Sequence, residues 1–201
     1  MNNNSCIKNV GSTIVFGSYY QTDSTKKEPI EWQILAVEGN KSLIISKKIL
    51  DCKKYNESYE SVTWESCSIR KWLNNEFKNL AFSESEQQRI QTTCVTNKNN
   101  PTYNTNGGSN TTDKIFLLSI EDACKYFSTD DERACMATEY AKEKGIHVDS
   151  FSGNSQWWLC SPGNDQDFAS YVFVDGFIEA HGHIVTSNNN GVRPALWISN
   201  I

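Results

Sequence analysis

The first part of the chain alternates short apolar runs with polar turns, a pattern typical of β-strands. Residues 13–16 form one apolar run, and residues 30–37 and 41–46 form two more. The latter two flank Glu38-Gly39-Asn40, where Gly and Asn supply the positive φ angles that tight turns need. The sequence therefore predicts an early strand followed by a β-hairpin over residues 30–46.

The middle of the chain has signals for helices. Between Trp64 and Asn79 the apolar residues recur at helical spacing. Ser83 and Glu86 match a capping box, which predicts a second helix to about Thr92. Further caps predict helices over 119–127 and 138–144, the latter ending at Gly145.

The segments between these helices have different compositions. Residues 97–112 are rich in Asn, Thr and Gly, which indicates a long loop. Residues 115–118 are a continuous apolar run, which predicts a buried strand.

Strand patterns return from Trp157 to Ile198, the segment that we name the display region. Runs at 157–160 and 169–174 predict two strands, with a turn at Asp175-Gly176. Residues 177–181 then alternate, so Phe177, Glu179 and His181 are expected on one face of the next strand. Gly182 is interpreted as a second turn, with residues 183–185 returning and 192–198 closing the chain. Because strands precede and follow the helices, the order predicts an α+β fold.

Length and charge limit the possible functions. The 201 residues fit one domain, with an N-terminal part over 10–150 and the display region over 157–198. The formal net charge is −5, and Arg193 is the single Lys or Arg after Lys144. Since a phosphate-binding groove needs several cations, we expect no nucleic-acid partner.

No apolar run approaches the length of a membrane span, and the N-terminus lacks the layout of a secretion signal. We therefore expect no membrane partner and a cytoplasmic location, with association with a virion as an alternative. The oligomeric state stays open.

The seven cysteines form no CxxC pair, which argues against a structural zinc site. Reduced thiols are the expectation in a chain without an export signal, with a bridge between Cys52 and Cys67 as the alternative.

Several motifs together resemble an uncharacterised bacterial domain family with the C-type-lectin fold, found in Firmicutes and their phages. The matching segments cover nearly the whole chain: Pro29-Ile30-Glu31-Trp32, Leu50-Asp51-Cys52, Val62-Thr63-Trp64-Glu65, Ile69-Arg70-Lys71-Trp72-Leu73-Asn74, residues 113–119 (DKIFLLS), Trp157-Trp158-Leu159, Ser161-Pro162-Gly163 and residues 191–197 (GVRPALW). Cys160 departs from the pattern, since members usually carry Arg there.

That fold is shared with the variable proteins of diversity-generating retroelements and with formylglycine-generating enzymes. The resemblance therefore implies a C-type-lectin-like scaffold of short antiparallel strands and flanking helices, with one variable face that binds a protein or a glycan. No cofactor is implied, and we expect no enzymatic activity, because neither Cys160 nor the His181/His183 pair has the partners that its chemistry would need.

The candidate ligand-binding residues are the polar and aromatic positions that face outward by alternation or lie in loops. Rigid rings and adaptable amides together are typical of a recognition surface. The set comprises Asn164, Asp165, Asp167, Phe168, Tyr171, Phe173, Asp175, Phe177, Glu179, His181, His183, Thr186, Asn188, Asn189 and Asn190. A solvated face is the alternative, and a register slip would place Phe173 or Phe177 in the core. Most of these residue types are reachable from an Asn codon by changes at its adenines, although Glu179 is not reachable from AAC.

Two residues of the flanking framework, Trp158 and Arg193, also have expected roles. Trp158 is the tryptophan most expected to touch a ligand, because its neighbour Trp157 should point to the opposite face. Arg193 is expected to pair with a carboxylate or to bind carbonyls beneath the display face.

Three groups of residues offer alternatives to non-covalent ligand binding. His181 and His183 with nearby carboxylates suggest a metal site, but no third ligand has a fixed spacing, so no metal is expected. Residues 188–190 resemble a calcium loop only superficially. Cys160 suggests a relative of formylglycine-generating oxidases, although an inert buried thiol is the simpler interpretation. A structural or phage assembly module is a third alternative.

Overall fold

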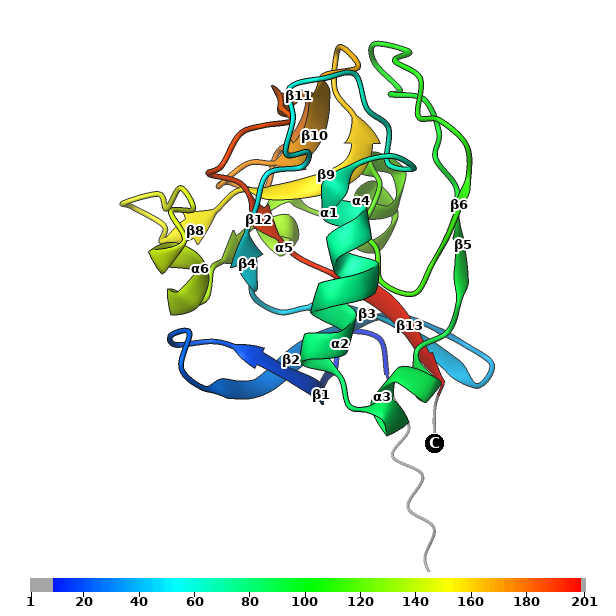
Figure 1. The fold of residues 1–201 in the computed structure, drawn as a ribbon, viewed down its shortest axis with the longest axis vertical. Coiled ribbons are helices and arrows are strands. Elements are labelled where there is room, and N and C mark those ends of the chain that lie inside the picture. Colours follow the sequence, from blue (N-terminus) through cyan, green and yellow to red (C-terminus); the bar gives the residue numbers. More distant parts are fainter. Residues whose placement is uncertain (1–8, 200–201) are drawn as a thin grey trace, which may run out of the picture.

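Two β-sheets, one at each end of the molecule, frame the helices in the computed structural model, which describes residues 9–199 (Figure 1). The lower sheet is antiparallel and has the order β1-β2-β3-β13. Its strands are β1 (Thr13–Tyr20), β2 (Lys27–Glu38), β3 (Lys41–Ser46) and β13 (Ala195–Ser199). The β2–β3 pair confirms the predicted hairpin, and β1 contains the predicted early strand.

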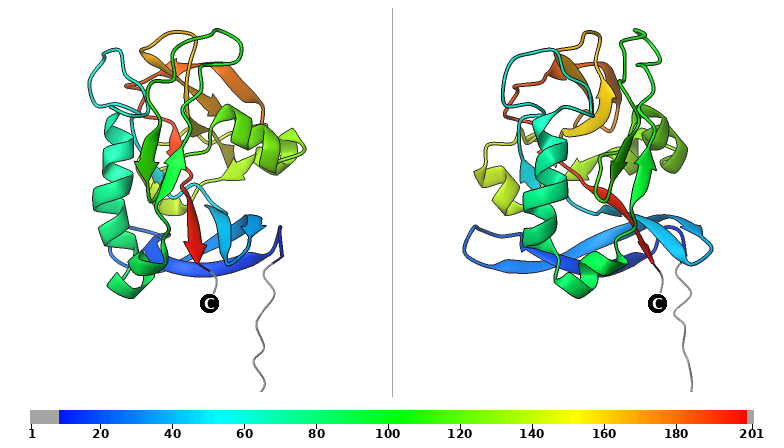
Figure 2. Two further views of the ribbon diagram at one scale, coloured as in Figure 1. Left: turned by 90° about the vertical axis from the view of Figure 1, so that its right-hand side faces the viewer. Right: turned by 45° about the vertical axis from the view of Figure 1, so that its right-hand side comes forward.

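The upper sheet has the order β11-β10-β9-β12-β4, so β11 is an edge strand. Its strands are β4 (Asp51–Cys52), β9 (Trp157–Pro162), β10 (Phe168–Val172), β11 (Ile178–Ile184) and β12 (Gly191–Val192). The end of the chain passes from β12 in this sheet to β13 in the lower sheet, as the red segment in Figure 2 shows. The display region therefore extends into both sheets.

The longest helical run stands between the two sheets (Figure 1). It consists of α1 (Ser68–Trp72), the π-helical segment η1 (Leu73–Phe77) and α2 (Lys78–Ala81). The predicted helix is thus confirmed, but it begins at Ser68 rather than Trp64. Ile69, Leu73 and Phe77 are buried along its inner face.

The capping boxes predicted from the sequence are present. Ser83 and Glu86 begin α3 (Glu84–Arg89), which ends before Thr92, and Ser119 with Asp122 begins α4 (Ile120–Tyr126). The last predicted helix is α6 (Glu139–Glu143), and the φ of Gly145 after it is 94°. Within residues 9–199, no helix is long and apolar enough to cross a membrane.

Several short elements were not predicted from the sequence, although Thr129 and Glu132 match a cap for the helix that begins at Asp130. They are β5 (Thr93–Val95), β6 (Thr111–Asp113), α5 (Asp130–Arg133), β7 (Cys135–Met136) and β8 (Asn154–Ser155). The strand predicted at 115–118 is wrong, because the run is buried but only Phe116 makes a bridge, to Ala195. A short apolar run can be buried without belonging to a strand, and periodicity does not distinguish the two cases. The chain as a whole is α+β, as predicted, with mostly strands and few short helices.

Candidate functional site

The turn that joins β10 to β11 holds two exposed aromatic rings. Phe173 is 38% exposed and Phe177 is 52% exposed. Their backbones are joined by a 2.8 Å bond from the Phe173 N–H to the Phe177 carbonyl, and Gly176, with φ of 89°, donates back to the Phe173 carbonyl at 3.0 Å. The Asp175 side chain accepts from the Phe177 N–H at 2.9 Å. The turn is therefore well fixed, and neither ring has slipped into the core.

The tip of this hairpin rests on α5. A side chain at position 176 would collide with the backbone carbonyl of Asp130, so the tip and the helix approach as closely as glycine permits. Arg133 donates from Nε to the Gly176 carbonyl at 2.9 Å and also forms an ion pair with Asp130. The backbone at the start of α5 therefore contacts the tip of the hairpin, in the turn between the two phenylalanines.

Tyr171 was expected to face the ligand, and the structure corrects this. Its ring stacks on His183 at 5.3 Å between centroids and meets the edge of Trp158 at 6.3 Å. Tyr171 is only 9% exposed, and burial, with a smaller contribution from Glu179, raises its pKa. The Tyr171 ring therefore packs within the protein and is not available to contact a partner.

The prediction that Trp158 contacts a ligand is also wrong. Trp158 is fully buried, because it packs against both Tyr171 and Tyr55 while its indole N–H donates to the Lys53 carbonyl at 2.9 Å. Alternation assigns two faces to a strand, but here both faces of β9 are covered, since Trp157 on the other face is buried as well. Trp158 cannot touch a ligand in this conformation.

Gly182 is not a turn, contrary to the prediction. Strand β11 runs through it to Ile184, and the pairing with β10 is irregular between Ala169 and Tyr171, as in a β-bulge. Gly182 has φ of 86°, and a Cβ there would lie 2.7 Å from the Ala169 carbonyl oxygen. A positive φ serves bulges as well as turns, so the glycine alone did not distinguish them.

The bulge separates the two histidines that share the HGH motif. His181 lies against Phe168 and Tyr103, at 5.8 and 5.9 Å between centroids, whereas His183 lies against Tyr171. In the described part of the chain, no group of three His, Cys, Asp or Glu side chains could hold a metal ion. The two rings have separate surroundings and do not form a site together.

The Asn-rich loop at 188–190 faces inward more than predicted. Asn190 is fully buried, and its Oδ1 accepts from Gln156 Nε2 at 2.8 Å and lies 2.9 Å from His183 Nδ1. Backbone carbonyls of the same loop accept from the Lys53 and His147 N–H groups. These partners are distant in sequence, which is why the alternation and turn signals missed them.

The candidate residues thus divide by exposure. The exposed members are Asp165, Phe173, Asp175, Phe177, His181 and Asn188. The half-buried members are Asn164, Asp167, Phe168, Glu179, His183, Thr186 and Asn189. Tyr171 and Asn190 are buried, which removes them from direct contact.

The loop that contains Asn100 lies against the β10–β11 hairpin. The sequence indicated no role for this loop. The side chain of Asn100 is buried and donates to the carbonyls of Pro162 and Ala180, each at 2.8 Å, and to that of Gly163 at 3.2 Å. Its Oδ1 accepts from the Thr102 and Tyr103 N–H groups. Asn100 therefore fixes both the loop and the hairpin, and it brings the 45% exposed Tyr103 next to His181.

The sequence held one usable signal for this loop. Asn100-Pro101 favours a turn, and the loop contains Asn104, the one non-glycine residue with positive φ among those described. Nothing in the sequence indicated which strand the loop would touch.

A second loop, residues 53–63, is attached to the same region. The side chain of Gln166 donates to the carbonyls of Val62 and Asn106, both within 3.1 Å, so it joins this loop to the Asn100 loop. A hydrogen bond to the Asp167 carboxylate raises the pKa of Tyr59. We give the name edge surface to six exposed or half-buried residues on or beside the β10–β11 hairpin: Tyr103, Phe173, Asp175, Phe177, Glu179 and His181.

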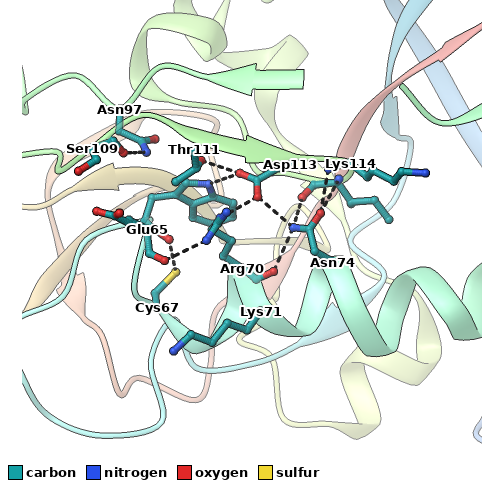
Figure 3. A network of polar contacts seen from close by, with 12 residues as sticks. Glu65, Cys67, Arg70, Lys71, Asn74, Asn97, Ser109, Thr111, Asp113 and Lys114 are labelled. Carbon is teal, nitrogen blue, oxygen red and sulfur yellow. Dashed lines mark hydrogen bonds and ion pairs between the residues drawn. The ribbon is translucent and has the colours of Figure 1, made fainter. Parts of the chain in front are cut away.

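A different group of polar residues lies buried beside the long helix (Figure 3). Asp113 accepts from Arg70 Nε at 2.7 Å, from Thr111 Oγ1 at 2.6 Å and from the Trp64 indole at 3.1 Å. Asn74 donates to the Ile115 carbonyl and accepts from the N–H groups of Lys114 and Ile115. Three of the motif segments therefore converge on Asp113, and its carboxylate is occupied by framework donors.

The alternative of a disulfide between Cys52 and Cys67 is wrong. Cys52 and Cys67 are both free thiols, as are Cys94, Cys124, Cys135 and Cys160. Burial raises the pKa of Cys52 and of Cys67 to about 12, and it raises the pKa of Cys160 well above its usual range. A nucleophilic cysteine needs the opposite shift, so these surroundings argue against catalysis by Cys160.

Arg193 has the framework role expected of it. Its guanidinium is buried between the rings of Phe127 and Trp157 and donates to the carbonyls of Ser46 and Arg133. Burial lowers its pKa. Of the two expected partners, the structure shows the second: backbone carbonyls accept the hydrogen bonds of the guanidinium.

Comparison with known proteins gives one match. No curated protein and no solved structure matches the chain significantly. The model of the family described as a domain of unknown function, DUF6273, matches residues 39–200, which includes the Asp113 network and the whole edge surface. The chain therefore belongs to the DUF6273 family.

Proposed function

We propose that this protein is a ligand-binding protein that recognises a protein or a glycan through the edge surface. The observation that carries the proposal is the pair of exposed rings, Phe173 and Phe177, held on a fixed turn. Aromatic rings contribute a large contact area at a low cost in side-chain entropy, which is why they dominate binding surfaces.

The supports beneath the edge surface favour recognition by a preorganised surface. Tyr171 and Trp158 pack under the hairpin, α5 holds its tip, and Asn100 fixes the neighbouring loop. A surface that is ordered before binding loses less entropy when a partner arrives. Such an arrangement suits non-covalent binding and needs no cofactor.

We further propose that the scaffold is C-type-lectin-like and that the display region is, or descends from, a variable region of a diversity-generating retroelement. The support is that the three motif segments that contain Trp64, Arg70 and Asp113 meet in the buried Asp113 network, while most of the candidate residues between the later motifs reach the surface. The DNA beside the gene tests the second part: a reverse transcriptase and a near-identical template that differs at adenines are expected, and their absence would refute it.

The binding proposal is tested with two defined probes, a glycan array and a displayed library of random dodecapeptides. Each binder is then titrated against wild type, Phe177→Ala and Phe151→Ala. Phe151 is 99% exposed and lies outside the edge surface, so it controls for the mere loss of an exposed ring. Binding that is lost in Phe177→Ala and kept in Phe151→Ala supports the proposal, whereas equal binding by both variants refutes it.

A further inference from the structure

We infer that the hairpin tip recognises a cationic segment of a protein partner, with Lys or Arg side chains lying over Phe173 and Phe177. The inference rests on the proposed function and adds the chemical class of the partner. It starts from what surrounds the two rings at the tip.

Both elements that meet at the hairpin tip carry carboxylates. Asp175 and Glu179 belong to the hairpin, and the exposed Asp131 and Glu132 belong to α5, whose backbone touches Gly176. Asp175 accepts from the Phe177 N–H and Glu132 accepts from the Ser128 N–H, but each still carries its charge at the surface. The tip therefore combines apolar rings with several negative charges.

The arginine side chains near the hairpin do not reach the surface. Arg133 and Arg193 are both buried and donate to backbone carbonyls, and Arg133 also forms an ion pair with Asp130. After Lys144 the sequence contains no Lys or Arg other than Arg193. The hairpin itself carries no Lys or Arg to balance Asp175 and Glu179, and the buried Arg133 at its tip is already paired with Asp130, so a partner can supply the remaining counter-charges.

Lys and Arg side chains match this combination of rings and carboxylates. Their aliphatic stems pack on aromatic rings while the charged ends reach carboxylates, and a cation over a ring face adds a further attraction. A negative surface also accelerates the encounter with a positive partner in a manner that depends on salt.

The amides that a neutral glycan would use are less available. Asn190 is buried against Gln156 and His183, and Asn189 accepts from Ser187. The groups that point outward at the tip are carboxylates and phenyl rings. This distribution favours a basic polypeptide over an uncharged sugar.

The experiment selects dodecapeptides from the random library on the full chain and then measures their binding to four proteins. These are wild type, Phe177→Ala, the double variant Asp131→Asn with Glu179→Gln, and a control double variant, Glu76→Gln with Glu143→Gln. The control removes the same charge from exposed positions on other helical segments. A glycan array is run in parallel with the same four proteins.

We expect selected peptides to be enriched in Lys and Arg. Their affinity should fall about tenfold in the tip double variant, and about as much when salt rises from roughly 0.05 to 0.5 M, but not in the control. Peptides without this enrichment, glycans that bind through Phe177, or equal binding by both double variants would overturn the inference and leave the proposed function standing. Binders unaffected by Phe177→Ala would refute the proposed function itself.

Discussion

Two groups of carboxylates in this molecule have opposite surroundings. Asp113 is buried and receives four donors, from Trp64, Arg70, Asn74 and Thr111, whereas Asp175 and Glu179 lie at or near the surface on the hairpin that carries the exposed Phe173 and Phe177. The difference separates framework from display: a carboxylate saturated by internal donors holds the fold, and a carboxylate beside exposed rings is free to meet a partner. Substitutions at the two places should therefore affect different measurements.

The largest effect is expected at the centre of the buried network. Asp113→Ala removes the acceptor of the Trp64 indole and leaves Arg70 without its ion pair, which should cost about 3 kcal/mol of stability. Urea unfolding measures it. Glu65→Ala, at an exposed neighbour of the same network, should cost less than about 0.5 kcal/mol. Similar losses for the two variants would contradict the framework role.

Tyr171 and Phe177 make the next comparison, within the hairpin itself. Tyr171→Ala opens a cavity between Trp158 and His183 and should cost about 3 kcal/mol. Phe177→Ala removes an exposed ring and should change stability by less than about 0.5 kcal/mol. Thermal unfolding of both variants gives the answer, and a marked loss of stability in Phe177→Ala would show that its ring is part of the core.

The contribution of the neighbouring loop is tested at Asn100. Asn100→Ala removes one donor from three carbonyls and the acceptor of two N–H groups, and it should cost about 2 kcal/mol. Hydrogen exchange of the amides at 102–105 should accelerate at the same time. Thr102→Ala, an exposed position in the same loop, is the control, and exchange that stays at the wild-type rate in Asn100→Ala would sink the assignment.

The buried thiols predict an effect of a different kind, a decline of stability at alkaline pH. The pKa of Cys67 is raised from 9.0 to about 12 in the folded chain, so the unfolded chain loses its proton first. Stability from this group is complete below pH 9 and falls as pH rises toward 12, with a slope of at most about 1.4 kcal/mol per pH unit.

Cys67→Ala should flatten this decline, as measured by urea unfolding at a series of alkaline pH values. Ile69→Val, at a buried neighbour without a titrating group, should lower the whole curve without changing its slope. An unchanged slope in Cys67→Ala would show that the thiol does not titrate in this way.

Local signals in the sequence were sufficient for the elements of the lower sheet and for most helices. The β2–β3 hairpin follows from two apolar runs around Gly39, and Ser83 and Ser119 begin helices as capping boxes predict. These features depend on residues within a few positions of one another, so a single sequence contains the necessary information.

Side-chain directions in the display region were harder to predict, because they depend on distant partners. Tyr171 is covered by Trp158 and His183, and Asn190 is held by Gln156, none of which the alternation reveals. The bulge at Gly182 then changes the direction of His181 relative to His183. Phe173 and Phe177 are exposed, as expected, because the Asp175-Gly176 turn is local.

The most direct test of the central claim is the affinity of one selected binder for Phe177→Ala and for Phe151→Ala, measured side by side. Both variants lose one exposed phenylalanine, but only Phe177 belongs to the edge surface. We predict that Phe177→Ala weakens binding by at least about tenfold and that Phe151→Ala leaves it unchanged. Equal affinities in the two variants would contradict recognition through the edge surface.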